Sequence, residues 1–389
     1  MPGAVRESAS GALRESIRGR VAQIRHLSLD WAMPAARSKP EPEPRTAPRP
    51  AAGEPGPEIL HFPVAIPVPD ISPWLAGNTG IPGFTTRDSG RPGPHVALIS
   101  LIHGNELAGA IALEEMLRGD VWPNSGKLTF GFANIAAFAR FDAANPAASR
   151  FVEEDMNRVW DDIQLFGVRR SLELDRAREI RPLIDTADTV LDLHSMLWPS
   201  DPLILCGMSG PSRRLAMALG TPDLVVADRG HAGGKRLIDY PRFTEAGCSA
   251  SCVLVEAGQH WEPATIAQAR RSIAALLHVT GLRPITPEPE RSRARFAEVT
   301  HLITARTNRF IFTRAFRGGE IIRRAGTPIA HDGDTEIRTP YADCLLIMPS
   351  HRPILGHTVI RLAKIRNDDD SAAGAPRIRR PAAAAKAYR

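Results

Sequence analysis

The stretch VALISLIHGNELAGAIALEEML, residues 96–117, indicates the fold of this chain. A mostly apolar run ends at His103, and a helical pattern of apolar residues begins after Glu106. Short apolar segments followed by helices are typical of buried strands in an α/β sheet. We therefore expect a strand over 95–101 and a helix over 105–118, with Asn105 as the helix cap.

The same alternation of strands and helices continues to Pro284. Beyond Pro284, short β-like pieces are separated by Gly and Pro, a pattern that predicts a smaller all-β domain. The expected fold is thus α/β, a sheet flanked by helices with a C-terminal all-β domain. The pattern predicts strands at 127–134, 189–195, 202–207 and 251–258 and helices at 168–184 and 263–281.

The chain divides into four expected segments. Residues 1–58 and 367–389 are rich in Pro, Ala and basic residues, so we expect them to be disordered. Between them we expect an α/β domain over 59–284 and the β-rich domain over 285–366.

The net charge of +6 comes from the ends of the chain. Residues 1–56 carry +3 and residues 371–389 carry +5, which leaves −2 for the segment between them. A mildly acidic core argues against a nucleic-acid-binding domain. The sequence also has no apolar run long enough for a transmembrane helix and no secretory signal, so we expect a cytoplasmic protein without a membrane partner.

Two histidines end apolar strands. His103 is followed by Glu106 in the first helical turn, and His194 ends the strand at 189–195. Carboxyl ends of such strands share one edge of a sheet, and two imidazoles with one carboxylate form many catalytic zinc sites. Asp192 would face the same side as His194 and could orient it. The alternative for each histidine is a hydrogen-bonded surface residue.

Polar residues also crowd the segment at 148–161. Arg150 could polarise a carbonyl, whereas Asn157 and Arg158 could bind a carboxylate. The alternative is a solvated loop of surface ion pairs. Glu256 ends another apolar strand, where a buried carboxylate needs a partner or a task, such as general base catalysis.

Four motifs together resemble the succinylglutamate desuccinylase and aspartoacylase family, whose fold is that of the zinc carboxypeptidases. The motifs are HGNE (103–106), RFVEEDMNR (150–158), DLHS (192–195) and VEAG (255–258), and the resemblance covers about residues 90–365. It implies a zinc carboxypeptidase-like mixed sheet. It also implies one Zn²⁺ per chain bound by His103, Glu106 and His194, with Glu256 as catalytic acid/base, Arg150 polarising the scissile carbonyl, and Asn157 and Arg158 holding a substrate carboxylate.

The chain departs from the family at one position. Aspartoacylase-like members carry a further arginine about ten residues before the catalytic glutamate, where this chain has Ala246, and Arg242 is out of register. The identity of the amino acid is therefore left open. The glycine-rich segment at 229–237 lacks the spacing of a phosphate loop, and we expect a flexible active-site loop.

The expected function is a zinc-dependent deacylase that hydrolyses the acyl amide bond of an N-acyl amino acid, or a related small carboxylate-bearing amide or ester. The alternatives are a zinc carboxypeptidase acting on peptide C-termini and a non-catalytic zinc-binding relative. The expected partner is a small N-acyl amino acid, and homo-oligomerisation is left open.

Overall fold

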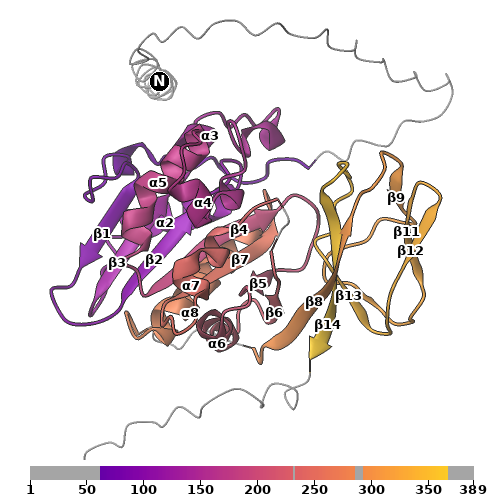
Figure 1. Cartoon of the computed structure of the whole chain (residues 1–389). Helices are drawn as coiled ribbons and strands as arrows, with labels where there is room; N and C mark the ends of the chain where they lie inside the picture. The colour runs from indigo at the N-terminus through magenta and orange to yellow at the C-terminus, as the bar shows by residue number, and fades with distance from the viewer. Residues whose placement is uncertain (1–61, 231–232, 285–291, 367–389) are drawn as a thin grey trace, which may run out of the picture. The chain divides into compact units, whose positions relative to one another are not determined.

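A computed structural model describes residues 62–230, 233–284 and 292–366 (Figure 1). The described residues from Ala65 onward belong to one compact unit. The predicted disordered segments, 1–58 and 367–389, lie outside the described residues. No helix in the described ranges is long and apolar enough to cross a membrane.

An eleven-stranded mixed sheet runs through this unit, with β1 at one end and the C-terminal strands at the other (Figure 1). Four neighbouring strands, β3, β2, β4 and β7, run parallel to one another. At the two borders of this parallel part, β1 pairs antiparallel with β3 and β5 pairs antiparallel with β7. In spatial order the strands are β1 (Phe84–Asp88), β3 (Lys127–Phe132), β2 (His95–Ser100), β4 (Thr189–Met196), β7 (Ser251–Gln259), β5 (Leu203–Leu205), β6 (Leu224–Ala227), β8 (Arg295–Thr304), β14 (Thr358–Arg366), β13 (Cys344–Ile347) and β10 (Ile321–Ile322).

Helices cover both faces of the parallel part of the sheet. α5 buries Leu174 and Ile180 in one cluster with Ile99 and Val190 of the strands. Gly109 of α2 lies against Ser100 and Leu193, which point to the opposite face. The helices are α2 (Leu107–Arg118), α3 (Ile135–Phe138), α4 (Asp162–Leu165), α5 (Leu172–Ile184), α6 (Gly210–Leu219), α7 (Pro241–Thr244) and α8 (Pro263–Val279), with 3-10 turns at Ser72–Trp74, Pro146–Ser149, Met156–Arg158 and Leu237–Asp239.

The structure confirms the predicted strands and the helices α2, α5 and α8, with shifts of a few residues at their ends. The sequence pattern missed β1, α6 and β6. The predicted cap at Asn105 is wrong. The helix begins at Leu107, Glu106 occupies the N-cap position, and no side chain caps the helix there. Asn105 is buried instead, and its Oδ1 has no hydrogen-bond partner among the described residues.

The C-terminal part contains strands and no helix among its described residues, as predicted. It includes a small antiparallel sheet of β12 (Thr335–Arg338), β11 (Pro328–Asp332) and β9 (Phe310–Phe312). Its other strands extend the main sheet, because β8 pairs in parallel with β6 on one side and antiparallel with β14 on the other. On β13, Leu345 and Ile347 face the main core, whereas Cys344 and Leu346 face the smaller one. The domain boundaries themselves stay predictions.

Candidate active site

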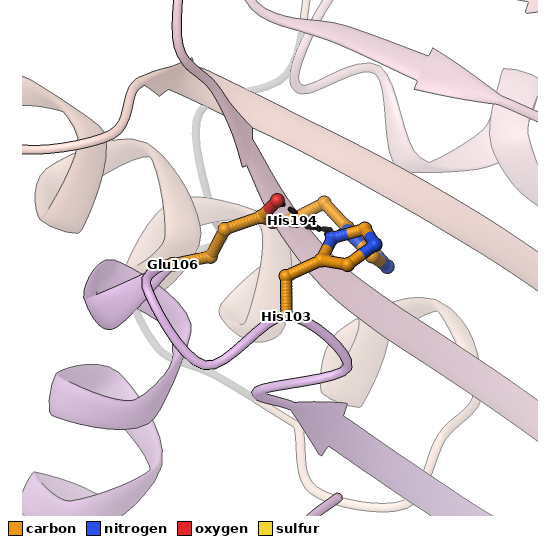
Figure 2. A group of neighbouring side chains, drawn as sticks. All are labelled: His103, Glu106 and His194. Carbon is orange, nitrogen blue, oxygen red and sulfur yellow. Dashed lines mark hydrogen bonds and ion pairs between the residues drawn. The ribbon is translucent and has the colours of Figure 1, made fainter. Parts of the chain in front are cut away.

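Three side chains converge at the carboxyl edge of the parallel strands (Figure 2). His103 and Glu106 come from the turn between β2 and α2, and His194 comes from the end of β4. The Nδ1 atoms of His103 and His194 lie 2.7 and 3.0 Å from the two oxygens of Glu106. All three side chains are buried, and a donor atom of each lies within 4.8 Å of the others.

Close packing explains the glycine in this turn. A Cβ on Gly104 would come within 2.4 Å of the backbone of Ala137 and Phe138, so any larger residue would push the turn away. The amide of Gly104 also donates to the carbonyl of Arg150 at 3.1 Å. The turn that carries two of the three donors is thereby tied to the loop that carries the arginines.

A second carboxylate lies behind each histidine. Asp155 Oδ1 is 2.9 Å from Nε2 of His103, and Asp192 Oδ2 is 2.9 Å from Nε2 of His194, although the angle at His194 is outside the hydrogen-bond range. Arg150 Nη2 is also 2.9 Å from Nε2 of His103. The carboxylate is an acceptor, so we assign the proton of Nε2 to the bond with Asp155. That tautomer leaves the Nδ1 lone pair available to a cation held between His103 and Glu106.

The charges around this group favour a cation. Despite burial, the neighbouring His103 and His194 lower the pKa of Glu106 well below its usual range. Burial likewise opposes protonation of His194, but Asp192 and Glu106 raise its pKa well above the usual range. Two imidazole nitrogens and a carboxylate, backed by two further carboxylates, therefore fit a divalent metal ion.

Glu256 lies beside this group because of strand register. β4 and β7 are parallel, and their register pairs His194 with Glu256. Burial and the charge of Glu106 raise the pKa of Glu256 to about 8. Its Oε2 has no hydrogen-bond partner in the described part of the chain. Glu256 is therefore a carboxyl group close to its titration point at neutral pH, as a proton-transferring group should be.

A cavity of about 410 Å³ opens over these residues. Arg150 and Arg158 line it, and burial lowers the pKa of Arg158 to about 10. Asn157 also lines it, with Oδ1 accepting from the amide of Leu237 at 2.9 Å. The rest of the wall is formed by His103, Glu106, His194, Ser195, Met196, Leu197, Trp198, Ser200, Leu205, Arg236, Leu254, Glu256, His260, Met348, Pro349, Ser350, Arg352, Ile354, Thr358 and Arg361.

Glu173 holds the loop that delivers the arginines. Its carboxylate is completely buried and accepts the backbone amides of residues 152, 153 and 154 at 2.6, 3.1 and 3.3 Å. Oε1 also accepts from the side-chain amide of Asn134 at 3.1 Å. A single carboxylate in α5 thus fixes the backbone that connects Arg150 to Asp155.

The segment that carries this site matches a known protein family in sequence. Residues 92–280 match the sequence model "Succinylglutamate desuccinylase/Aspartoacylase catalytic domain". Residues 92–280 belong to the succinylglutamate desuccinylase/aspartoacylase family. The matched segment contains the three metal-ligand candidates, the arginine loop and Glu256. No curated protein sequence matches the chain significantly.

Several solved structures share this fold. Succinylglutamate desuccinylase from Vibrio cholerae aligns with a TM-score of 0.57 at 17% identity, over 74% of this chain and 88% of its own. A succinylglutamate desuccinylase/aspartoacylase from Rhodobacter sphaeroides gives 0.55 at 20% identity, over 73% and 89%. Murine aminoacylase 3 gives 0.52 at 15% identity, over 71% and 96%.

Several residues of the site were not predicted from the sequence. Arg236 was placed in a flexible loop, but it is buried and forms ion pairs with Asp228 and Asp239 at 3.0 and 2.7 Å. Arg361 reaches the cavity from β14 and lies 3.0 Å from Asp228. Arg242, by contrast, donates to the carbonyl of Ala187 outside the cavity wall. The apolar strand that precedes Asp228 was the one sequence feature that could have indicated this cluster of charged residues.

Proposed function

We propose that this chain is a zinc-dependent deacylase that hydrolyses the acyl amide bond of an N-acyl amino acid. The observation that carries the proposal is the buried group of His103, Glu106 and His194 with Glu256 in register beside it. These three residues would hold the zinc ion. When bound, Zn²⁺ supplies a Lewis acid that polarises a carbonyl and makes water more acidic.

The chain's own residues divide the remaining work. Glu256 takes a proton from the attacking water and returns it to the departing amine, since its pKa near neutrality suits both steps. Arg150 lies 3.2 Å from Glu106 and lines the cavity, so it would donate to the carbonyl oxygen as negative charge develops there. Asn157 and Arg158 would hold the carboxylate of the amino acid and so orient the scissile bond.

The cavity wall favours a deacylase over a carboxypeptidase. Part of the cavity wall comes from the C-terminal strands and their connection, namely from Met348, Pro349, Ser350, Arg352, Ile354, Thr358 and Arg361. A volume of about 410 Å³ suits a small ligand. A peptide chain would have to leave through the opening past this wall. We therefore expect N-acyl amino acids to be better substrates than peptides.

The test is a hydrolysis screen with metal removal. The protein is dialysed against a chelator, reloaded with zinc, and assayed on N-acyl amino acids, their amides and esters, and short peptides. Activity that is lost with the metal, returns with zinc and favours N-acyl amino acids supports the proposal. Zinc-loaded protein that hydrolyses only peptides would replace the deacylase by the carboxypeptidase, and zinc-loaded protein without any hydrolysis would favour a non-catalytic relative.

Arg158→Lys tests carboxylate recognition. Lysine keeps the charge but loses the planar pair of donors. We expect a loss of about tenfold in kcat/KM on N-acyl amino acids, because one hydrogen bond to a charged group is removed. The loss should be much smaller on the corresponding amides. Equal losses on both would show that Arg158 is structural, through its contact with Asp155 at 3.8 Å.

A further inference from the structure

His260 is a buried histidine of the cavity that the proposed reaction does not use. It follows the last residue of β7, and its backbone amide donates to the carbonyl of Met196 at 2.9 Å. Its side chain is part of the cavity wall with Glu256 and the three metal-ligand candidates. The ring is therefore fixed at the end of two neighbouring strands, within the chamber where the chemistry would occur.

One hydrogen bond determines which ring nitrogen carries the proton. Nδ1 of His260 lies 2.8 Å from Oγ of Ser195, which is itself buried. Within the described ranges, Ser195 Oγ has no other hydrogen-bond partner. If Nδ1 donated, the hydroxyl proton would be left buried without an acceptor, which is costly. The hydroxyl therefore donates to Nδ1, and the proton of the neutral ring sits on Nε2.

Nε2 is the free end of the ring. It makes no hydrogen bond to any residue that the structure describes. Burial lowers the pKa of His260 to about 4, with Arg150 and His103 adding to the effect against the opposing charge of Glu106. The ring is thus uncharged at neutral pH. The cavity wall consequently includes a neutral imidazole N–H donor among several guanidinium groups.

The neutral donor suits an uncharged oxygen. Carboxylates of a ligand pair preferentially with guanidinium groups, since charge-assisted bonds are the stronger ones. We propose that His260 contacts the substrate and donates from Nε2 to the carbonyl oxygen of the acyl group, with Ser195 fixing the tautomer. The role of His260 in the reaction rests on the proposed function, whereas the assignment of its tautomer does not.

The ring is held from a second direction as well. Trp261, the next residue, packs against the imidazole with a centroid distance of 5.3 Å, and its Nε1 donates to the carbonyl of Asn105 at 3.1 Å. The amide of Ser195 donates to Glu106 Oε2 at 2.9 Å. The donor is therefore pre-oriented against the same turn that carries Glu106, which is what a donor to a developing negative charge requires.

Nuclear magnetic resonance of the zinc-loaded protein tests the tautomer without any substrate. Protein labelled with ¹⁵N-histidine is compared with His260→Gln to assign the ring. The expected spectrum shows a protonated Nε2 and an unprotonated Nδ1, with both tautomers populated in Ser195→Ala. A protonated Nδ1 in the wild type would overturn the assignment, even if the protein proved to have no deacylase activity.

Kinetics test the contact. We expect His260→Ala to lower kcat/KM about tenfold, mainly through kcat, because a donor to the reacting carbonyl acts chiefly in the transition state. His260→Gln should recover most of the loss, zinc content should be unchanged, and His301→Ala on the exposed face of β8 should behave as wild type. The loss should be equal on an N-acyl amino acid and its amide. A loss confined to the free acid, or equal defects in the Ala and Gln variants, would refute the contact.

Discussion

Glu173→Gln should destabilise the protein and disable the arginine loop. The carboxylate is completely buried, and each of its oxygens accepts two hydrogen bonds, at 3.1 and 2.6 Å for Oε1 and at 3.1 and 3.3 Å for Oε2. Glutamine offers one acceptor oxygen and turns an NH₂ group toward donors. At least two hydrogen bonds to a charged group are lost, each worth about 1.5–3 kcal/mol. We expect a loss of about 3 kcal/mol in the free energy of unfolding.

Urea denaturation measures this loss. With an m-value of about 3 kcal/mol/M, the midpoint should fall by about 1 M. The matched control is Glu179→Gln in the same helix, because Glu179 is 45% exposed and, among the described residues, pairs with Arg176 alone, which stays bound to three backbone carbonyls. That variant should lose less than about 1 kcal/mol.

Activity provides the second readout for Glu173→Gln. Its kcat/KM should fall far more than that of the control, because small displacements of Arg150 and Arg158 misplace the substrate. Midpoints for the two variants that agree within about 0.2 M would refute the reasoning, since the buried carboxylate would then contribute no more than the exposed one.

The remaining predictions concern the metal and the base. His103→Ala and His194→Ala should each lose zinc, measured by elemental analysis, while circular dichroism shows a folded chain; full zinc content in the folded double variant would contradict the ligand assignment. Glu256→Gln should retain zinc and lose about 10²–10⁴-fold in kcat, and turnover within twofold of wild type would exclude it as the base. Asp155→Asn and Asp192→Asn should each weaken zinc binding by about 10–100-fold in a chelator competition, because each carboxylate orients a histidine; unchanged affinity in both would assign them a purely structural role.

Local patterns were enough to predict the residues that lie at strand ends. His103, His194 and Glu256 each follow an apolar run, and the parallel sheet brings such positions to one edge. Chain order alone could not predict the register that pairs His194 with Glu256, because register depends on how separate strands pack.

Residues that act across the fold were not predictable in this way. Glu173 looks like a solvated charge in the first turn of an amphipathic helix, and only the folded loop shows the amides around it. Arg361 lies in a short β-like segment more than 100 residues from Glu256, so its place in the cavity depends on β14 joining the main sheet. Asn105 is a residue type that often caps helices, but in the fold Glu106 occupies the N-cap position and Asn105 is buried before it.

The continuity of the sheet has a consequence for how the chain can be divided. A fragment ending at residue 284 would contain every motif of the family match, yet it would leave β6 as an open apolar edge, since β6 would then pair only with β5, through Val225 and Val226. It would also remove Leu345 and Ile347 from the main core. Open apolar edges recruit other chains. Such a fragment should therefore aggregate on expression, even though it contains the whole segment of the family match.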